Sequence, residues 1–328
     1  MSAKPFTELD WPEKLAFMNK YDNFSRLYGI KLVDYAAGFA RLEMRLTPVH
    51  WNSQKRLHGG WSAALLVIAA NKAALSYGFK CQISTLSMNY FHGVAEGNLQ
   101  IVAKERQRDE HWAVYEVDIL ADDKLAVSSG TICFVPSREP LDWHLRPVPT
   151  CERQFAGKLP EWPAERADLH ADIPGLRPCF KQADWQGKAQ YLNETENFHY
   201  TEGIELTGYG AGHCRMEFAN VQPQNLNPDG ILDPAWLAVL MDQLIGKASL
   251  YDGYFNVTAQ TSINFYEAYL QNSGGVYGVA EEKSRDEHFC VFSGDITDAA
   301  GELLASGTCT MYLRHKEIDF QRERPSQA

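Results

Sequence analysis

Four residues in the first third of the chain have types and a spacing that could do chemistry. They are Asn52, His58, Gly59 and Gly60, in the stretch NSQKRLHGGWSAALLVIAAN that begins at residue 52. An imidazole and a carboxamide can orient a carbonyl group, and backbone amides at the start of a helix can hold a developing negative charge. An active site of this kind would also need an acid or a nucleophile. The apolar run that follows, from Trp61 to Ala70, contains no carboxylate.

An internal repeat shows where the missing carboxylate can come from. GIKLVDYAAGFARLEM, from Gly29 to Met44, aligns without gaps to GIELTGYGAGHCRMEF, from Gly203 to Phe218. Three shorter matches follow in the same order, SMNYF with SINFY, RDEH with RDEH and SGT with SGT, and the offset drifts only from 174 to 177 residues. A doubled chain can divide one function between its copies.

The two copies differ at the positions that could do chemistry. The second copy reads NPDGILDPAWLAVLMDQLIG from residue 227. The equivalents of Asn52, His58, Gly59-Gly60 and Val67 are Asn227, Asp233, Pro234-Ala235 and Asp242. The histidine and the glycine pair are therefore present only in the first copy, and the carboxylate nine residues further on only in the second.

The elements that must position these residues follow the same order in both copies. In the first, a leading helix from about Pro12 to Leu27 precedes an alternating strand, the loop with Asn52 and His58, and the apolar helix. Further alternating strands follow, such as AVYEVDIL and LAVSSGTICFV. One long buried helix followed by antiparallel strands predicts an α+β unit whose sheet wraps around the helix.

The copies are separated by a proline-rich segment. We predict an N-terminal domain over residues 1–137, an ordered linker over 138–188 and a C-terminal domain over 189–328. The linker carries Trp143 and Trp185, which supply apolar anchors that a flexible spacer would lack.

The Asn52 to Gly60 loop, the apolar helix and the SMNYF strand together resemble the hotdog-fold thioesterases of the phenylacetyl-CoA thioesterase type. Both copies fit this pattern, so the resemblance implies a tandem double hotdog in which the two copies form an intrachain pseudo-dimer. In that family the loop supplies Asn, His and Gly, and an acid nine residues after the His acts in the site of the neighbouring subunit. A further hydroxyl, at the start of the next strand, maps onto Thr258 in the second copy and onto Ile83 in the first.

The resemblance implies one composite active site per chain. Its catalytic residues would be Asn52, His58, Gly59, Asp242 and Thr258, and Gly60, Lys55 and Arg56 would contact the substrate. The reciprocal site would be inactive, because it would be built from Asn227, Asp233, Ala235, Val67 and Ile83.

The predicted reaction is hydrolysis of an acyl-CoA or related acyl thioester to the free acid and the thiol. The Gly59 N–H at a helix start would stabilise the oxyanion, and Asp242 would act as nucleophile or general base. Some of these residues also have structural interpretations. Asn52 is typical of a turn or helix cap, Lys55 and Arg56 fit either a CoA phosphate or a solvated loop, and the two RDEH segments are expected to be hairpin turns.

The amino-acid composition argues against some classes of function. The 328-residue chain has 31 basic and 42 acidic residues, a net charge of −11, and no basic block, which argues against nucleic acid as a partner. The chain also lacks an apolar signal core, and its apolar run is too short to span a bilayer. Its seven cysteines form no CxxC pair, so we expect a cytoplasmic location.

The remaining expectations concern cofactors, assembly and the alternative functions. We find no HExxH, GxSxG, P-loop or GxGxxG motif, so we expect neither a metal nor a cofactor. We expect a homodimer of double hotdogs, as in related folds. The alternatives to a thioesterase are a non-catalytic acyl-thioester binding protein and a hotdog-fold hydratase or dehydratase.

Overall fold

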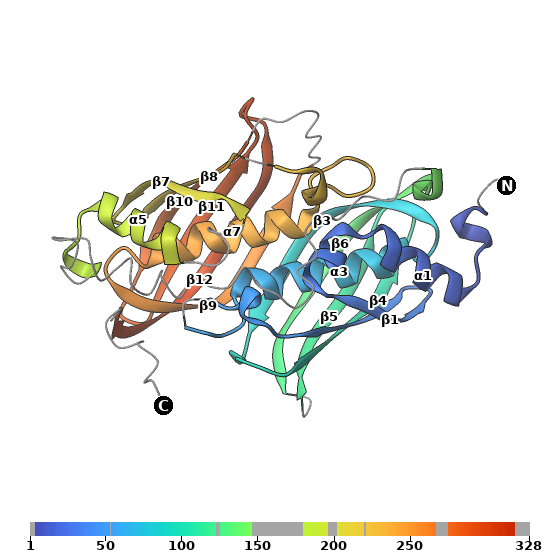
Figure 1. Ribbon diagram of the computed structural model, residues 1–328, viewed down its shortest axis with the longest axis horizontal. Helices are drawn as coiled ribbons and strands as arrows, with labels where there is room; N and C mark the ends of the chain where they lie inside the picture. Colours follow the sequence, from blue (N-terminus) through green and yellow to red (C-terminus); the bar gives the residue numbers. More distant parts are fainter. Residues whose placement is uncertain are drawn as a thin grey trace.

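The structure is a computed structural model, and it describes residues 4–52, 54–122, 125–145, 180–195, 202–219, 221–266 and 275–318 (Figure 1). The helices are α1 (Trp11–Tyr21), α2 (Asn23–Tyr28), α3 (Gly59–Leu75), α5 (Trp185–Thr195) and α7 (Pro234–Ser249). The first six strands are β1 (Lys31–Ala36), β2 (Phe39–Arg45), β3 (Phe79–Tyr90), β4 (Asn98–Arg108), β5 (Ala113–Ala121) and β6 (Ala126–Pro140). The other six are β7 (Ile204–Gly210), β8 (His213–Phe218), β9 (Tyr254–Phe265), β10 (Val276–Arg285), β11 (Phe289–Thr297) and β12 (Leu303–Glu317).

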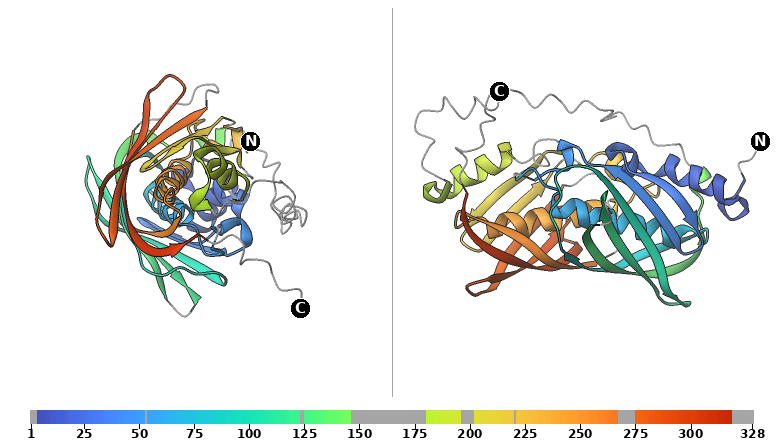
Figure 2. Two further views of the ribbon diagram at one scale, coloured as in Figure 1. Left: turned by 90° about the vertical axis from the view of Figure 1, so that its left-hand side faces the viewer. Right: turned by 90° about the horizontal axis from the view of Figure 1, so that it is seen from below.

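The strands form one continuous antiparallel sheet. Its order is β1-β2-β4-β5-β6-β3-β9-β12-β11-β10-β8-β7, so the second half repeats the order of the first in reverse. The two halves join through β3 and β9, which pair from Thr85↔Asn264 to Asn89↔Gln260. In the end-on view the sheet curves around the two long helices (Figure 2). The α+β prediction of two tandem hotdog units forming a pseudo-dimer is confirmed.

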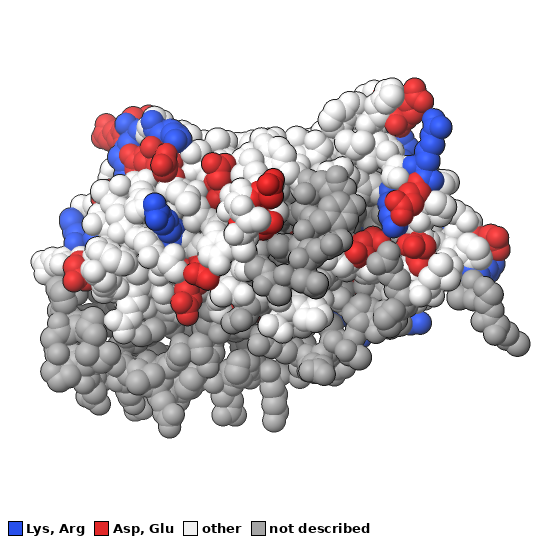
Figure 3. Space-filling view, turned by 90° about the horizontal axis from the view of Figure 1, so that it is seen from above, with Lys and Arg blue, Asp and Glu red and all other residues white. Residues whose placement is uncertain are grey.

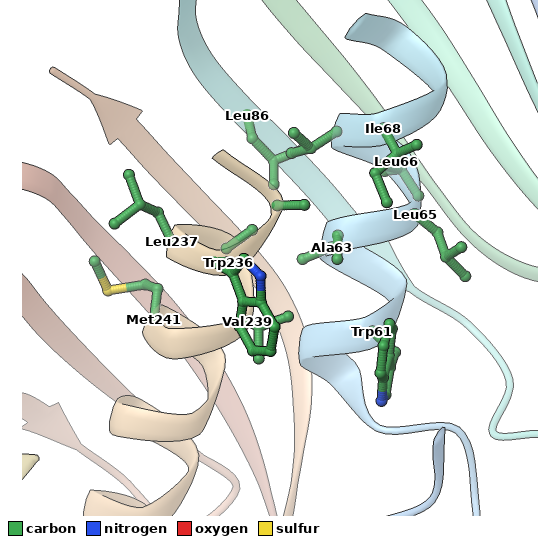
Figure 4. Packing of buried hydrophobic residues seen from close by; sticks show 14 of the residues in the cluster. Trp61, Ala63, Leu65, Leu66, Ile68, Leu86, Trp236, Leu237, Val239 and Met241 are labelled. Carbon is green, nitrogen blue, oxygen red and sulfur yellow. The ribbon is translucent and has the colours of Figure 1, made fainter. Parts of the chain in front are cut away.

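The helices α3 and α7 form the core between the two units. Apolar residues cover nearly every side of α3, so a single sheet cannot cover it, and Trp61 and Trp236 are both fully buried. Figure 4 shows the helices side by side, with Ala63 of α3 and Trp236 and Val239 of α7 between them. The start of α3 contacts Val239 and Asp242, and the start of α7 shares a cavity with the second half of α3, so the helices run antiparallel.

The repeated SGT motif has a packing function. Gly130 lies on β6 under α3, where an added Cβ would be 2.6 Å from Cδ2 of Leu66. Its equivalent, Gly307 on β12, lies under α7, where a Cβ would be 2.8 Å from the Ser262 carbonyl oxygen and 3.2 Å from Cγ of Met241. Glycine at both positions therefore allows each helix to approach its own sheet closely.

The leading helix differs from the prediction, which had one helix from Pro12 to Leu27. The structure has two helices, because Asp22 ends α1 and caps α2 by accepting a hydrogen bond from Ser25 N at 2.9 Å. The second carboxylate oxygen of Asp22 pairs with the buried Lys72 ammonium of α3. The side chain that breaks the helix thus compensates a buried charge, and the sequence pattern did not show this partner.

The predicted linker lies mostly outside the described residues. Strand β6 extends to Pro140, and helix α5 begins at Trp185. Residues 146–179 are not described. The domain boundaries at residues 137 and 188 stay predictions. Within the described ranges, no helix is long and apolar enough to cross a membrane.

Surface charges stand in small groups of both signs on the face shown in Figure 3. Ion pairs also form at strand ends, such as Arg285 with Glu282 at 2.6 Å and Arg108 with Glu105 at 2.9 Å. These pairs adjoin the two RDEH segments, which form hairpin turns. In each turn the aspartate, Asp109 or Asp286, accepts two backbone hydrogen bonds.

Candidate active site between the two copies

His58 stands at the start of α3, where it faces the other copy. Its side chain is 9% exposed and serves as the N-cap of the helix, with Gly60 N 2.9 Å from Nδ1. The same Nδ1 lies 3.1 Å from Oδ2 of Asp242, which belongs to α7 of the second copy. The antiparallel packing of the two helices therefore joins the loop of one copy to the carboxylate of the other.

Asp242 is buried and has partners on both of its oxygens. Only 4% of its side chain is exposed. Thr258, on the adjacent strand β9, donates a hydrogen bond to Oδ1 at 3.2 Å, and the His58 ring contacts Oδ2. The structure thus brings together His58, Gly59, Asp242 and Thr258, all of which the sequence proposed. Their catalytic roles stay predictions.

The two glycines of the loop lie against different neighbours. A Cβ on Gly59 would lie 2.7 Å from Oδ1 and 3.0 Å from Oδ2 of Asp242, so the carboxylate occupies the space of a side chain. A Cβ on Gly60 would lie 3.1 Å from the Val239 carbonyl oxygen, in the contact between α3 and α7. As the first residue of α3, Gly59 also has an N–H with no acceptor inside the helix. Gly59 therefore makes room for the carboxylate, and Gly60 makes room for the opposing helix.

Two further residues of the site were missed by the sequence analysis. Gln243 is fully buried, and its Nε2 lies 2.9 Å from Nε2 of His58. Tyr90 on β3 donates a hydrogen bond to the Gly59 carbonyl oxygen at 3.3 Å. Burial, followed by the charge of Asp242, raises the pKa of Tyr90 well above its usual range, so the phenol keeps its proton.

A comparison of the two copies of the repeat could have identified both missed residues. The equivalent of Gln243 in the first copy is Ile68, and the equivalent of Tyr90 in the second copy is Phe265. Each polar group is therefore present in one copy only, like His58 and Asp242. Comparing every polar position of the helix and of the next strand would have found them.

Asn52 holds the loop in shape. Its Oδ1 accepts hydrogen bonds from the backbone N–H groups of Gln54 at 2.9 Å and Arg56 at 3.1 Å. Asn227 makes the equivalent contacts with Asp229 at 2.9 Å and Ile231 at 3.1 Å. The structure therefore shows the turn interaction of Asn52, and the copy without the histidine and the glycine pair keeps the same turn. A catalytic role of Asn52 stays a prediction.

The basic residues of the loop are exposed. Arg56 donates a hydrogen bond to the Gly93 carbonyl oxygen at 2.6 Å, and Lys55 has a positive φ of 56° in the tight turn. Contact of either residue with substrate stays a prediction.

The reciprocal position has a different chemistry. Asp233 replaces the histidine as the N-cap of α7 by accepting a hydrogen bond from Ala235 N at 3.0 Å. The positions equivalent to Asp242 and Thr258 are the buried, apolar Val67 and Ile83. A cavity of about 20 Å³ adjoins Asp233, Asp22 and Lys72, enough for about one water molecule. Burial, and then the charge of Asp22, raises the pKa of Asp233 to about 7.

Other nucleophiles and metal ligands do not cluster in the part of the chain that the structure describes. No group of three or more His, Cys, Asp or Glu side chains could hold a metal there. Cys309 lies near the site, but burial, followed by the charge of Asp242, raises the pKa of its thiol far above the usual range. A neutral buried thiol is a poor nucleophile, so Asp242 is the reactive group that the geometry favours.

Comparison with known proteins shows what the chain is similar to. Residues 47–135 match the model of the family described as the acyl-CoA thioesterase N-terminal domain. The chain is 28% identical over 119 residues to a protein of Archaeoglobus fulgidus named "Putative esterase", a match that spans 35% of this chain and 77% of that protein.

Two solved structures share the fold over most of the chain. A protein of unknown function with a hot dog fold from Alicyclobacillus acidocaldarius has a TM-score of 0.57 and 17% identity, over 89% of this chain and 97% of its own. An acyl-CoA thioesterase II from Mycobacterium marinum has a TM-score of 0.53 and 12% identity, over 88% of this chain and 97% of its own. At these identities the likeness establishes the tandem hotdog architecture.

Proposed function

We propose that this chain, which has a tandem hotdog fold and matches the acyl-CoA thioesterase N-terminal domain over residues 47–135, hydrolyses acyl-CoA thioesters at one composite active site. The observation that carries the proposal is the contact between the copies, in which the Asp242 carboxylate lies 3.1 Å from Nδ1 of His58 and beside Cα of Gly59. Only one of the two pseudo-symmetric positions has this set of groups.

In the proposed reaction, Asp242 acts on the carbonyl carbon of the thioester. It takes a proton from an attacking water molecule, or it attacks the carbon itself to form an anhydride that water then cleaves. In both routes a C–O bond forms while the carbonyl oxygen becomes an oxyanion. Collapse of this intermediate breaks the C–S bond, and the CoA thiolate leaves and takes up a proton.

The remaining groups of the site assist these steps. The free N–H of Gly59, at the positive end of α3, would donate to the oxyanion. Thr258 and His58 hold the two oxygens of the carboxylate, so that its orientation is fixed before substrate binds. Losing one oxyanion donor typically costs about 100-fold to 1000-fold in turnover.

The decisive test compares two aspartates at non-equivalent positions of the repeat. Release of free thiol is measured with a panel of acyl-CoAs and acyl-carrier-protein thioesters, for the wild type, Asp242→Asn and Asp233→Asn. We expect Asp242→Asn to lose about 100-fold or more in kcat, because the amide keeps the shape but cannot accept the proton or attack. Asp233→Asn should retain kcat, since asparagine is also a good N-cap.

Circular dichroism of all three proteins controls for folding. A wild type that binds acyl-CoA without releasing thiol would favour the non-catalytic binding protein. Equal losses in the two variants, or normal turnover of Asp242→Asn, would contradict the composite site.

A further inference from the structure

Two consecutive residues of α7 contact opposite nitrogens of one imidazole ring. Asp242 Oδ2 lies 3.1 Å from Nδ1 of His58, and Gln243 Nε2 lies 2.9 Å from Nε2 of the same ring. Gln243 has 0% exposure, and the His58 side chain is 9% exposed. The ring is therefore enclosed, and its hydrogen bonds are decided by these protein groups.

The contacts of Nδ1 compete with one another. A neutral imidazole carries its proton on one nitrogen and accepts on the other. With the proton on Nδ1, the ring donates to Asp242, Nε2 accepts from the Gln243 amide, and the Gly60 N–H 2.9 Å from Nδ1 loses its acceptor. With the proton on Nε2, Nδ1 accepts from Gly60 N–H at 2.9 Å, and its lone pair faces the carboxylate of Asp242.

The surroundings favour the first arrangement. The amide nitrogen of Gln243 faces Nε2, so a proton on Nε2 would meet an N–H group instead of an acceptor. A lone pair on Nδ1 would in addition repel the oxygen of Asp242 at 3.1 Å. We infer that Gln243 is a positioning residue, whose amide holds His58 in the tautomer that donates to Asp242. For its catalytic consequence this inference rests on the proposed function.

Gln243 would act through two other side chains. With Nδ1–H on Oδ2 and the Thr258 hydroxyl on Oδ1, both oxygens of Asp242 have a donor. Without the Gln243 amide, Nδ1 is free to accept from Gly60 N–H, and Asp242 loses one of its two donors. The apolar Ile68 stands at the equivalent position of α3, so only one of the two pseudo-symmetric sites has this amide.

The tautomer is measured directly by NMR of the wild-type protein labelled with ¹⁵N in its histidines. Long-range proton–nitrogen correlations distinguish Nδ1–H from Nε2–H, and the signal that disappears in His58→Gln identifies the ring. We expect Nδ1–H in the wild type and a gain of Nε2–H in Gln243→Met, which has a similar size but no hydrogen-bonding group. Gln243→Leu repeats the test in a second background. A wild-type ring with the proton on Nε2, or an unchanged tautomer in both variants, would overturn the inference.

Kinetics test the catalytic consequence. We expect Gln243→Met to lower kcat by about 10- to 100-fold while KM changes by less than about threefold, because the substrate contacts remain. Ile68→Met on α3 is the matched control and should retain kcat. A changed tautomer with kcat within about twofold of the wild type would refute the positioning role. If the wild type releases no thiol from any substrate, the proposed function fails, but the NMR result still decides the tautomer.

Discussion

Ser87 and Ser262 face each other across the central β3–β9 pair, and they are also equivalent positions of the internal repeat. The pseudo-two-fold axis of the molecule therefore passes through this pair. Residues elsewhere should have a counterpart across the axis. The hydrogen-bonding groups around Asp242 break this relation, since Val67 and Ile68 stand opposite Asp242 and Gln243. The scaffold is thus symmetric, while the chemical groups around Asp242 are not.

The close approach of Asp242 to Gly59 predicts the effect of one methyl group. Gly59→Ala would place Cβ 2.7 Å from Oδ1, so the carboxylate must move away from His58 and Thr258. We expect kcat to fall by about 100-fold or more, with a stability loss on the order of 1 to 3 kcal/mol. Steady-state kinetics and urea unfolding measure both quantities. Pro234→Ala at the equivalent position of α7 is the control, and an active Gly59→Ala enzyme would contradict the geometry.

Because of Asp233, we expect the protein to lose stability as the pH rises from acidic to neutral. Its pKa is raised from an ordinary value near 4 to about 7, so the folded state holds a proton that the unfolded state has released. The free energy of unfolding should therefore decrease as pH rises from about 4 to 7, by about 3 kcal/mol from this group. Asp22 and Lys72, which face Asp233, make the two other charges of the cluster.

Urea unfolding at several pH values, for the wild type and Asp233→Asn, tests this. The variant should show a smaller decrease over the same range. Parallel pH curves for the two proteins would show that Asp233 does not titrate there.

For His50 we expect the opposite effect, at lower pH: the free energy of unfolding should decrease as the pH falls. Burial lowers its pKa from 6.5 to about 4, so the folded state keeps the ring neutral while the unfolded state takes up a proton. Stability from this group should be lost as pH falls from about 6.5 to 4. Asn225 occupies the equivalent turn and accepts the equivalent backbone hydrogen bond, from Gln222 N at 2.7 Å.

His50→Asn therefore keeps the turn while removing the titrating group. The acid-side loss, measured by urea unfolding, should be smaller in this variant. An identical loss in His50→Asn would assign it to other groups.

The two halves should depend on each other for folding. Phe24 of the first copy packs against Trp61 at 5.5 Å and against Trp236 at 5.3 Å, between ring centroids, so the aromatic core is shared. Residues 1–140 or 188–328 alone would expose this core and the free edge of β3 or β9. We expect each half to be insoluble or inactive, and co-expression of both to restore thiol release. Activity of either half alone would refute the composite site.

A homodimer of double hotdogs also remains a prediction. Strand β10 exposes Tyr277 and Val279 on the face opposite α7, and Phe289 of β11 and Tyr312 of β12, which pair with each other, are exposed near the other end of β11. Exposed apolar side chains of this kind are typical of a surface that another subunit covers. Light scattering should give twice the mass of one chain, and Val279→Asp should reduce it. A wild-type monomer at micromolar concentration would contradict the prediction.

The sequence alone determined the double architecture of this protein. Hydrophobic periodicity and the repeat encode local conformation, so they predicted the α+β units, and they identified Asp242 by its position in the second copy. Only the tertiary structure showed that Asp22 divides the leading helix, that Asn52 serves its own turn, and that Gln243 reaches the far side of His58. The residues of this last pair are separated by 185 positions, and their contact depends on how closely two antiparallel helices approach. That distance is set by Gly60 against Val239, a packing relation that no local pattern contains.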